Sequence, residues 1–167
     1  NCLPLVSDAR EGLTELSDAI GAYSAPSAWT KKAASGLKDW NKILDAATAS
    51  TNSALPSDAQ VVGAVQRVCG SATTLVCAAG GLPGELHKIW RQGAPGSYHM
   101  EYGFSCMGYE IAGGLGVKLA KPKDEIVVMV GDGSYLMMNS EIASSVMLGA
   151  KLTIVILDNR GYGCINR

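Results

Sequence analysis

The sequence has little of several features that would point to a simple functional class. Only 17% of its 167 residues are charged and the net charge is −1, which gives no basis for an electrostatic nucleic-acid or membrane partner. No apolar run reaches the length of a bilayer-spanning helix. Aromatic residues make up 6% of the chain, whereas the hydrophobic set reaches 47%. That balance is typical of an ordinary globular domain and not of a disordered segment.

Common site motifs are missing as well. None of the five cysteines belongs to a CxxC pair, and no histidine is spaced to complete a zinc site. Cys69, Cys77 and Cys106 lie in apolar stretches, which predicts buried, reduced thiols of a cytoplasmic protein. No predicted strand is followed by GxGxxG with an acidic residue after the next strand, and the GxxxxGK[ST] loop is absent. Nicotinamide and P-loop nucleotide sites are therefore disfavoured.

The two ends of the chain look cut. It begins at Asn1 with neither a methionine nor a basic-then-apolar leader, and it stops at Arg167 shortly after a predicted strand. We therefore expect a fragment of a longer protein. Residues 1–20 predict a short strand at 2–6 and then a helix, and residues 21–56 predict an arm that is helical around 31–49.

Residues 57–167 alternate between predicted strands and helices. Continuous apolar runs predict strands at 73–79, 125–130 and 152–157, and apolar runs of this kind are typical of parallel strands buried on both faces. Helices are predicted around them, at 58–68, 85–91, 107–120 and 139–148. The sequence thus predicts an α/β fold, a parallel sheet with helices on both faces, incomplete at its C-terminal end.

Two polar segments directly follow consecutive predicted strands. Gly131-Asp132-Gly133 comes after one and Asp158-Asn159 after the next, so both are expected at the ligand-binding edge of the sheet. A carboxylate, an amide oxygen and a backbone carbonyl are hard oxygen ligands that suit Mg²⁺, which often takes further ligands from phosphates. Backbone N–H groups of Gly133 and Ser134 could hold a phosphate beside such an ion. The pattern predicts a Mg²⁺-bridged diphosphate.

A simpler interpretation of each segment stays open at this point. Asp-Gly is a common turn pair, and Asp158-Asn159 could be a loop that caps its own backbone. The combination of strand, GDG, helix, strand and Asn-bearing loop is more specific than either segment alone.

The segment from Gly131 to Asn159 resembles the signature of thiamine diphosphate enzymes, in which an Asn-bearing loop follows GDG at a fixed distance. The resemblance covers roughly residues 57–167 and matches the diphosphate-binding domain of the acetolactate synthase and pyruvate decarboxylase superfamily. Residues 1–20 resemble the end of that superfamily's central domain, and 21–56 the connecting arm. The stretches EYGFSCMGYEIAGGLG and LDNRGYGCINR most resemble the hydrolases that open trihydroxycyclohexane-1,2-dione, a cyclic 1,2-diketone of inositol catabolism.

The resemblance implies a site for thiamine diphosphate and Mg²⁺. It implies that Asp132 and Asn159 are side-chain metal ligands and that the carbonyl of Gly161 is a third ligand. It also implies a set of cofactor contacts: the diphosphate donors, the residue that supports the bent cofactor, the backbone that holds its aminopyrimidine, and a glycine loop with a histidine. By this resemblance, Gly131, Gly133 and Ser134 contact the diphosphate, and Met107 supports the bent cofactor. The backbone of Ser105 holds the aminopyrimidine, and the glycine loop with its histidine consists of Gly80, Gly81 and His87. Without the motif, Met107 would be assigned to the core and His87 to the surface.

The same resemblance places the glutamate that activates the cofactor in a separate pyrimidine-binding domain, and nothing in this sequence matches it. We therefore expect no catalytic residue here, and only half of a site that family members complete between subunits of a homodimer or homotetramer. The full-length protein is expected to hydrolyse a C–C bond of the cyclic dione, giving 5-deoxyglucuronate. An acetolactate synthase-like carboligase or decarboxylase, and a non-catalytic phosphate-binding module, remain alternatives.

Overall fold

The computed structural model describes residues 2–165, and the chain divides into two compact units, Asn1–Lys42 and Ile43–Arg167. The first unit contains helix α1 (Ala9–Ile20). Asp8 is its N-cap, and the side chain of Asp8 accepts the main-chain N–H groups of Arg10 and Glu11. Helix α2 (Ser27–Ala47) begins in the first unit and ends in the second. The strand predicted at residues 2–6 is wrong. These residues are exposed and form no strand, because no neighbouring strand in the described part of the chain pairs with them.

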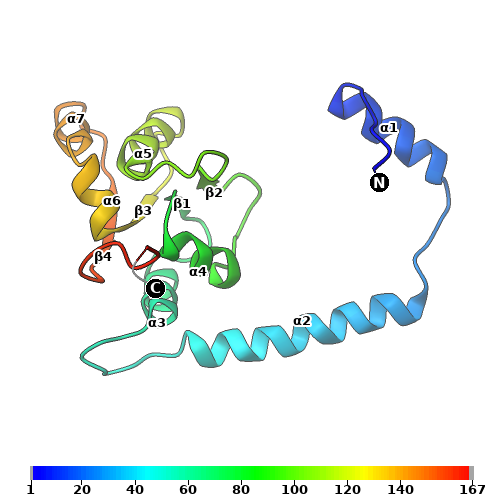
Figure 1. Cartoon of the computed structure of the whole chain (residues 1–167), viewed down its shortest axis with the longest axis horizontal. Helices are drawn as coiled ribbons and strands as arrows, with labels where there is room; N and C mark the ends of the chain where they lie inside the picture. The colour runs from blue at the N-terminus through cyan, green and yellow to red at the C-terminus, as the bar shows by residue number, and fades with distance from the viewer. Residues whose placement is uncertain (1, 166–167) are drawn as a thin grey trace. The chain divides into compact units, whose positions relative to one another are not determined.

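The second unit is built on a four-stranded parallel sheet (Figure 1). Its strands are β1 (Thr74–Cys77), β2 (Tyr98–Met100), β3 (Ile126–Gly131) and β4 (Thr153–Leu157), in the order β2-β1-β3-β4. Every pair in this order is parallel, so the predicted fold class is confirmed. The short strand β2 was not predicted from the sequence, since a three-residue strand within a loop gives no periodic signal.

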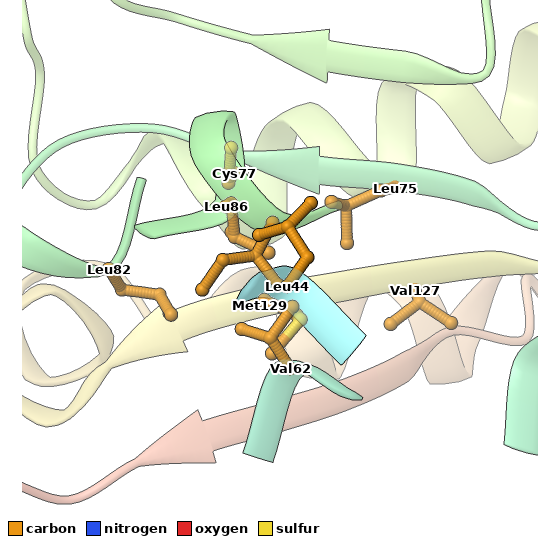
Figure 2. Close-up of a cluster of buried hydrophobic side chains, with 9 residues drawn as sticks. Leu44, Val62, Leu75, Cys77, Leu82, Leu86, Val127 and Met129 are labelled. Carbon is orange, nitrogen blue, oxygen red and sulfur yellow. The ribbon is translucent and has the colours of Figure 1, made fainter. Parts of the chain in front are cut away.

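Helices cover both faces of this sheet, and alternate strand residues separate the two cores. Helices α3 (Asp58–Cys69) and α4 (Gly81–Ile89) pack on one face, where Figure 2 shows Leu75, Val127 and Met129 gathered with Val62 and Leu86. On the other face, α5 (Tyr109–Ala120), α6 (Asp132–Met137) and α7 (Glu141–Met147) contact a second cluster, which contains Val76, Ile111, Ile126 and Val128. The buried strands β1 and β3 thus serve both cores.

Two predicted helices have different bounds in the structure. The helix predicted at 85–91 already begins at Gly81, so the glycine pair after β1 opens a helix and is not a free loop. The helix predicted at 139–148 is α7, which is preceded by the separate short helix α6 directly after β3. Among the described residues, no helix is both long and apolar enough to cross a membrane.

Strand β4 is less buried than its continuous apolar sequence predicts. It lies at the edge of the sheet, and its residues are exposed or half-buried, with Ile156 44% exposed. The prediction that both strands flanking the GDG segment are buried is therefore correct for β3 and wrong for β4.

Candidate functional site

The strand order changes direction at β1, because β2 and β3, the next two strands along the chain, lie on opposite sides of it. From β1 the chain passes through α4 to β2 on one side, and then through α5 to β3 on the other side, with α4 and α5 on opposite faces. Such a switch point opens a crevice beyond the carboxyl ends of the strands, which is the usual ligand position in open α/β sheets. A pocket lies there, lined by residues that follow β1, β3 and β4 and by Met107.

The pocket contains most of the residues predicted from the sequence. Those that line it are Gly80, Gly81, Met107, Gly131, Asp132, Gly133, Ser134, Asn159 and Gly161. Ser105 and His87 are not among its lining residues. Tyr162 and Cys164, from the segment that follows β4, also line the pocket.

The pairing of β3 with β4 brings Asp132 and Asn159 together. Gly131 and Leu157 are partners in the sheet, so the polar residues that follow them emerge side by side. Oδ2 of Asp132 accepts the N–H of Gly161 at 2.8 Å. The side-chain amide of Asn159 lies 3.2 Å from Oδ1 of Asp132 and 2.5 Å from the carbonyl oxygen of Gly161. The three predicted metal ligands therefore converge at one point.

The donor set fits a small hard cation. In the orientation that satisfies its hydrogen bonds, the Asn159 amide donates N–H groups to Oδ1 of Asp132 and to the carbonyl oxygen of Gly161. A half-turn of this amide would place its oxygen beside the other two, and three oxygens gathered at one point suit a positive ion. Adjacent ligands of an octahedral Mg²⁺ with bonds of about 2.1 Å lie roughly 3.0 Å apart, whereas Asn159 lies 3.2 Å from Asp132 and 2.5 Å from Gly161, so small shifts would be needed to accept the ion. Within the described residues, no cluster of three His, Cys, Asp or Glu side chains offers another metal site.

The neighbouring Asp158 has a structural role and is not one of the predicted metal ligands. Its Oδ1 accepts the N–H of Arg160 at 2.9 Å, so it caps the loop that follows β4. Arg160 and Gly161 both have positive φ, of 62° and 136°, and this sharp turn directs the Gly161 carbonyl toward Asn159. The two interpretations of Asp158-Asn159 thus apply to different residues: the aspartate caps the loop and the asparagine faces the site.

Glycine at position 133 is required by a close ring contact. A Cβ atom there would lie 2.6 Å from Cε1 of Tyr162, well inside van der Waals contact. Gly81 has a similar but looser contact, 3.1 Å to Sγ of Cys164. The segment that follows β4 therefore packs directly on the two glycine segments that follow β1 and β3.

The hydroxyl group of Ser134 is hydrogen-bonded to a buried carboxyl group. Its Oγ lies 2.8 Å from both carboxylate oxygens of Glu110, and the main-chain N–H of Gly108 donates to this Oγ at 2.7 Å and to Oε2 of Glu110 at 3.0 Å. Glu110 is 1% exposed and Ser134 3% exposed. Burial raises the pKa of Glu110, and the hydrogen bonds it accepts oppose that rise. Sequence reasoning did not identify Glu110 as part of the site, because a single glutamate in a helix usually faces solvent.

The segment before α5 is shaped by another glutamate. Glu101 accepts the main-chain N–H groups of Cys106 at 2.5 Å and Phe104 at 2.9 Å. These hydrogen bonds, that from Cys106 first, lower the pKa of Glu101. Ser105, between the two donors, has a positive φ of 56°. Cys106 is exposed, contrary to its predicted burial, because the tight turn directs this segment away from the core.

His87 lies outside the pocket. Its side chain is exposed, and its ring lies 5.7 Å from the ring of Tyr98 and 5.6 Å, edge-on, from that of Tyr102. The structure therefore groups His87 with two tyrosines beside the Glu101 turn and away from the predicted metal ligands.

Related proteins identify the family of the chain. Residues 78–167, more than half of the chain, match the family model described as thiamine pyrophosphate enzyme, C-terminal TPP binding domain. Two relatives named 3D-(3,5/4)-trihydroxycyclohexane-1,2-dione hydrolase, from Geobacillus thermodenitrificans (strain NG80-2) and Bacillus thuringiensis (strain Al Hakam), are each 36% identical over 99% of this chain. The chain spans 29% and 30% of the length of these relatives.

A solved structure shares the fold. The thiamine diphosphate-dependent 4-hydroxybenzoylformate decarboxylase of Rhodococcus jostii RHA1 superposes with a TM-score of 0.64 and 21% sequence identity, covering 70% of this chain and 22% of that protein. The family match over residues 78–167 places the chain among the thiamine pyrophosphate enzymes, and the chain carries their C-terminal TPP-binding domain.

Proposed function

We propose that this chain supplies the Mg²⁺ and diphosphate half of a thiamine diphosphate site in a hydrolase that opens a cyclic 1,2-dione. The observation that carries the proposal is the convergence of the Asp132 carboxylate, the Asn159 amide and the Gly161 carbonyl at the switch point of the sheet. One carboxylate and two neutral oxygens leave room for phosphate oxygens around a Mg²⁺ ion, which suits a site that holds metal and diphosphate together.

The residues of the chain have separate tasks in this proposal. Asp132 and Asn159 would bind Mg²⁺ through their side chains, and Gly161 through its carbonyl oxygen. Gly131, Gly133 and Ser134 would offer main-chain groups to the diphosphate, as would the pair Gly80 and Gly81 after β1. Since the hydroxyl of Ser134 is hydrogen-bonded to Glu110, its main-chain N–H is the group left for the cofactor.

The segment before α5 would hold the organic part of the cofactor. Met107, which lines the pocket, would support the bent cofactor, and the backbone of Ser105 and Met107 would contact the aminopyrimidine. His87, with Tyr102 beside it, would lie at the entrance used by substrate and not at the diphosphate. Thiamine diphosphate, when bound, supplies the nucleophilic carbon that adds to a ketone carbonyl, and this chain positions it.

The substrate is proposed from the relatives. Proteins 36% identical over nearly the whole of this chain are named as hydrolases of 3D-(3,5/4)-trihydroxycyclohexane-1,2-dione, so we propose the same dione here, with 5-deoxyglucuronate as product. We also propose that residues 1–20 end a central domain, that 21–56 are a connecting arm and that 57–167 are the diphosphate domain. For the full-length protein we propose a homodimer or homotetramer that acts in inositol catabolism in the cytoplasm.

The test is an assay of the full-length protein with Mg²⁺ and thiamine diphosphate. We expect it to consume the cyclic dione and to release one acid, and to leave pyruvate unchanged. Turnover of pyruvate alone would indicate an acetolactate synthase-like carboligase or decarboxylase. If neither substrate is consumed although thiamine diphosphate binds, the hydrolase proposal fails and a binding module is indicated.

A further inference from the structure

The buried carboxyl group of Glu110 lies where three pocket-forming segments meet. It accepts the hydroxyl hydrogen of Ser134, in the first turn of α6, and the main-chain N–H of Gly108, at the start of α5. The backbone of Ala79, two residues after β1, also lowers the pKa of this carboxyl group. These segments carry the residues on three sides of the pocket: Gly80 and Gly81, Met107, and Asp132 with Gly133.

A surface glutamate would not be placed in this way. Glu110 is 1% exposed, and none of the ion pairs formed by the described residues includes it. A buried carboxyl without a cationic partner lowers stability unless hydrogen bonds compensate. Besides its own main-chain N–H, the compensating donors come from Ser134 and Gly108, in or next to segments that line the pocket. Because these hydrogen bonds converge on one buried carboxyl group, they fix the spacing between those segments.

We propose that Glu110 is a positioning residue for thiamine diphosphate, whose carboxyl group ties the end of β1, the start of α5 and the first turn of α6 into one diphosphate cradle. This inference rests on the proposed cofactor site and adds to it a residue that does not itself contact cofactor or metal.

The effect on Ser134 is specific. Its Oγ donates its hydrogen to Glu110 and accepts the N–H of Gly108, so the hydroxyl group has both a donor role and an acceptor role filled inside the protein. The hydroxyl group is thus unavailable to the cofactor, and the proposed contact of Ser134 is its main-chain N–H. Removing the carboxyl group would free the hydroxyl hydrogen of Ser134 and would leave the N–H of Gly108 with the Ser134 hydroxyl in place of two acceptors.

The variants separate charge, hydrogen bonding and fold. Glu110→Gln keeps one acceptor oxygen and the side-chain volume but removes the charge. Glu110→Ala removes all acceptors. Ser134→Ala removes one donor and leaves the ties to Gly108 and Ala79. The matched control is Glu125→Gln, because Glu125 lies before β3, at the opposite end of that strand, and forms an exposed ion pair of 3.5 Å with Lys151.

The experiment is calorimetric titration of the full-length apo-protein with thiamine diphosphate at saturating Mg²⁺, together with the melting temperature of each apo-variant. We expect Glu110→Gln to raise the dissociation constant about tenfold, the scale of one lost charge-assisted hydrogen bond. Glu110→Ala should raise it further, Ser134→Ala less than Glu110→Gln, and Glu125→Gln should stay within about twofold of the wild type.

The outcomes distinguish the possible failures. If the Glu110 variants melt earlier but bind with wild-type affinity, the residue is only structural and the inference is overturned. If Glu110→Ala does not fold, Glu110→Gln and Ser134→Ala decide by the same criterion. If the wild type does not bind thiamine diphosphate with Mg²⁺, the proposed function fails and this inference fails with it. Wild-type binding with unaffected Glu110→Gln overturns the inference alone.

Discussion

The contact between Gly133 and Tyr162 allows the packing role and the cofactor role of a GDG glycine to be separated. In Gly133→Ala the new Cβ would lie 2.6 Å from Cε1 and 2.9 Å from Cδ1 of the Tyr162 ring. Gly133 has a helical position in α6 and no positive φ, so alanine is allowed by the backbone. The clash with the ring is therefore the main obstacle in the apo-protein.

The magnitude follows from two opposing effects. Overpacking of this kind costs about 1–3 kcal/mol, and the cost should lie near the lower end because Tyr162 is 42% exposed and its ring can move outward. Alanine instead of glycine in a helix returns up to about 1 kcal/mol. We expect a net loss of about 1 kcal/mol for Gly133→Ala in the wild-type background. In a Tyr162→Ala background the same substitution should be neutral or slightly stabilising.

The assay is a double-mutant cycle by chemical denaturation of the full-length protein, combined with thiamine diphosphate titration of all four proteins. A coupling energy of about 1 kcal/mol or more between the two positions is expected. If Gly133 also gives the diphosphate close access, cofactor affinity will remain low in the double variant although stability recovers. Full recovery of affinity would show that the glycine serves only Tyr162, and absence of coupling would refute the packing argument.

Three further predictions concern single residues. Burial raises the pKa of Glu110 in the folded protein above the value of about 4.3 in the unfolded chain. At a pH between the unfolded-state and folded-state pKa values, unfolding therefore releases a proton. The free energy of unfolding of the wild type should fall as pH rises through this range. Denaturation of wild type and Glu110→Gln from about pH 4 to 8 should show this difference, and a pH-independent difference would contradict it. The lowered pKa of Glu101 predicts the opposite sign, with its stabilisation present above about pH 4.3 and lost as pH falls through the folded-state value. Glu101→Gln and acid should therefore both lower the protection factors of the Phe104 and Cys106 amides, that is, their protection relative to the intrinsic exchange rate at the same pH. Unchanged exchange in Glu101→Gln would remove its role in the turn. Gly161→Ala should cost about 1–3 kcal/mol because φ is 136° there, and should weaken Mg²⁺ binding; a melting temperature equal to that of the wild type would contradict the strain.

The sequence was sufficient for the parts of the molecule that depend on local pattern. Continuous apolar runs predicted β1, β3 and β4, and the polar residues that follow β3 and β4 predicted one shared site at the sheet edge. The register of Gly131 opposite Leu157 is the physical reason that this succeeded, since it converts two sequence motifs into neighbours. The metal-ligand roles remain predictions.

Other features could not be predicted because they depend on tertiary packing. A glutamate in the first turn of a helix normally faces solvent, and only the packing of α5 against β1 and α6 buries Glu110. The strand β2 is too short to give a pattern, and it exists because Leu75, Val76 and Cys77 offer it partners. Cys106 lies in an apolar stretch, but the turn held by Glu101 exposes it.

The central claim, that Asp132 holds a metal ion for the diphosphate while its neighbour does not, is tested most directly by one matched pair. Thiamine diphosphate is titrated into the full-length protein with and without Mg²⁺, as wild type, Asp132→Asn and Asp158→Asn. Both substitutions remove one charge at the same edge of the sheet, and asparagine at 158 can still accept the N–H of Arg160. We predict that Asp132→Asn loses at least about tenfold of the Mg²⁺-dependent affinity and that Asp158→Asn stays within about twofold of the wild type. Wild-type affinity in Asp132→Asn, or an equal loss in both variants, would contradict the account.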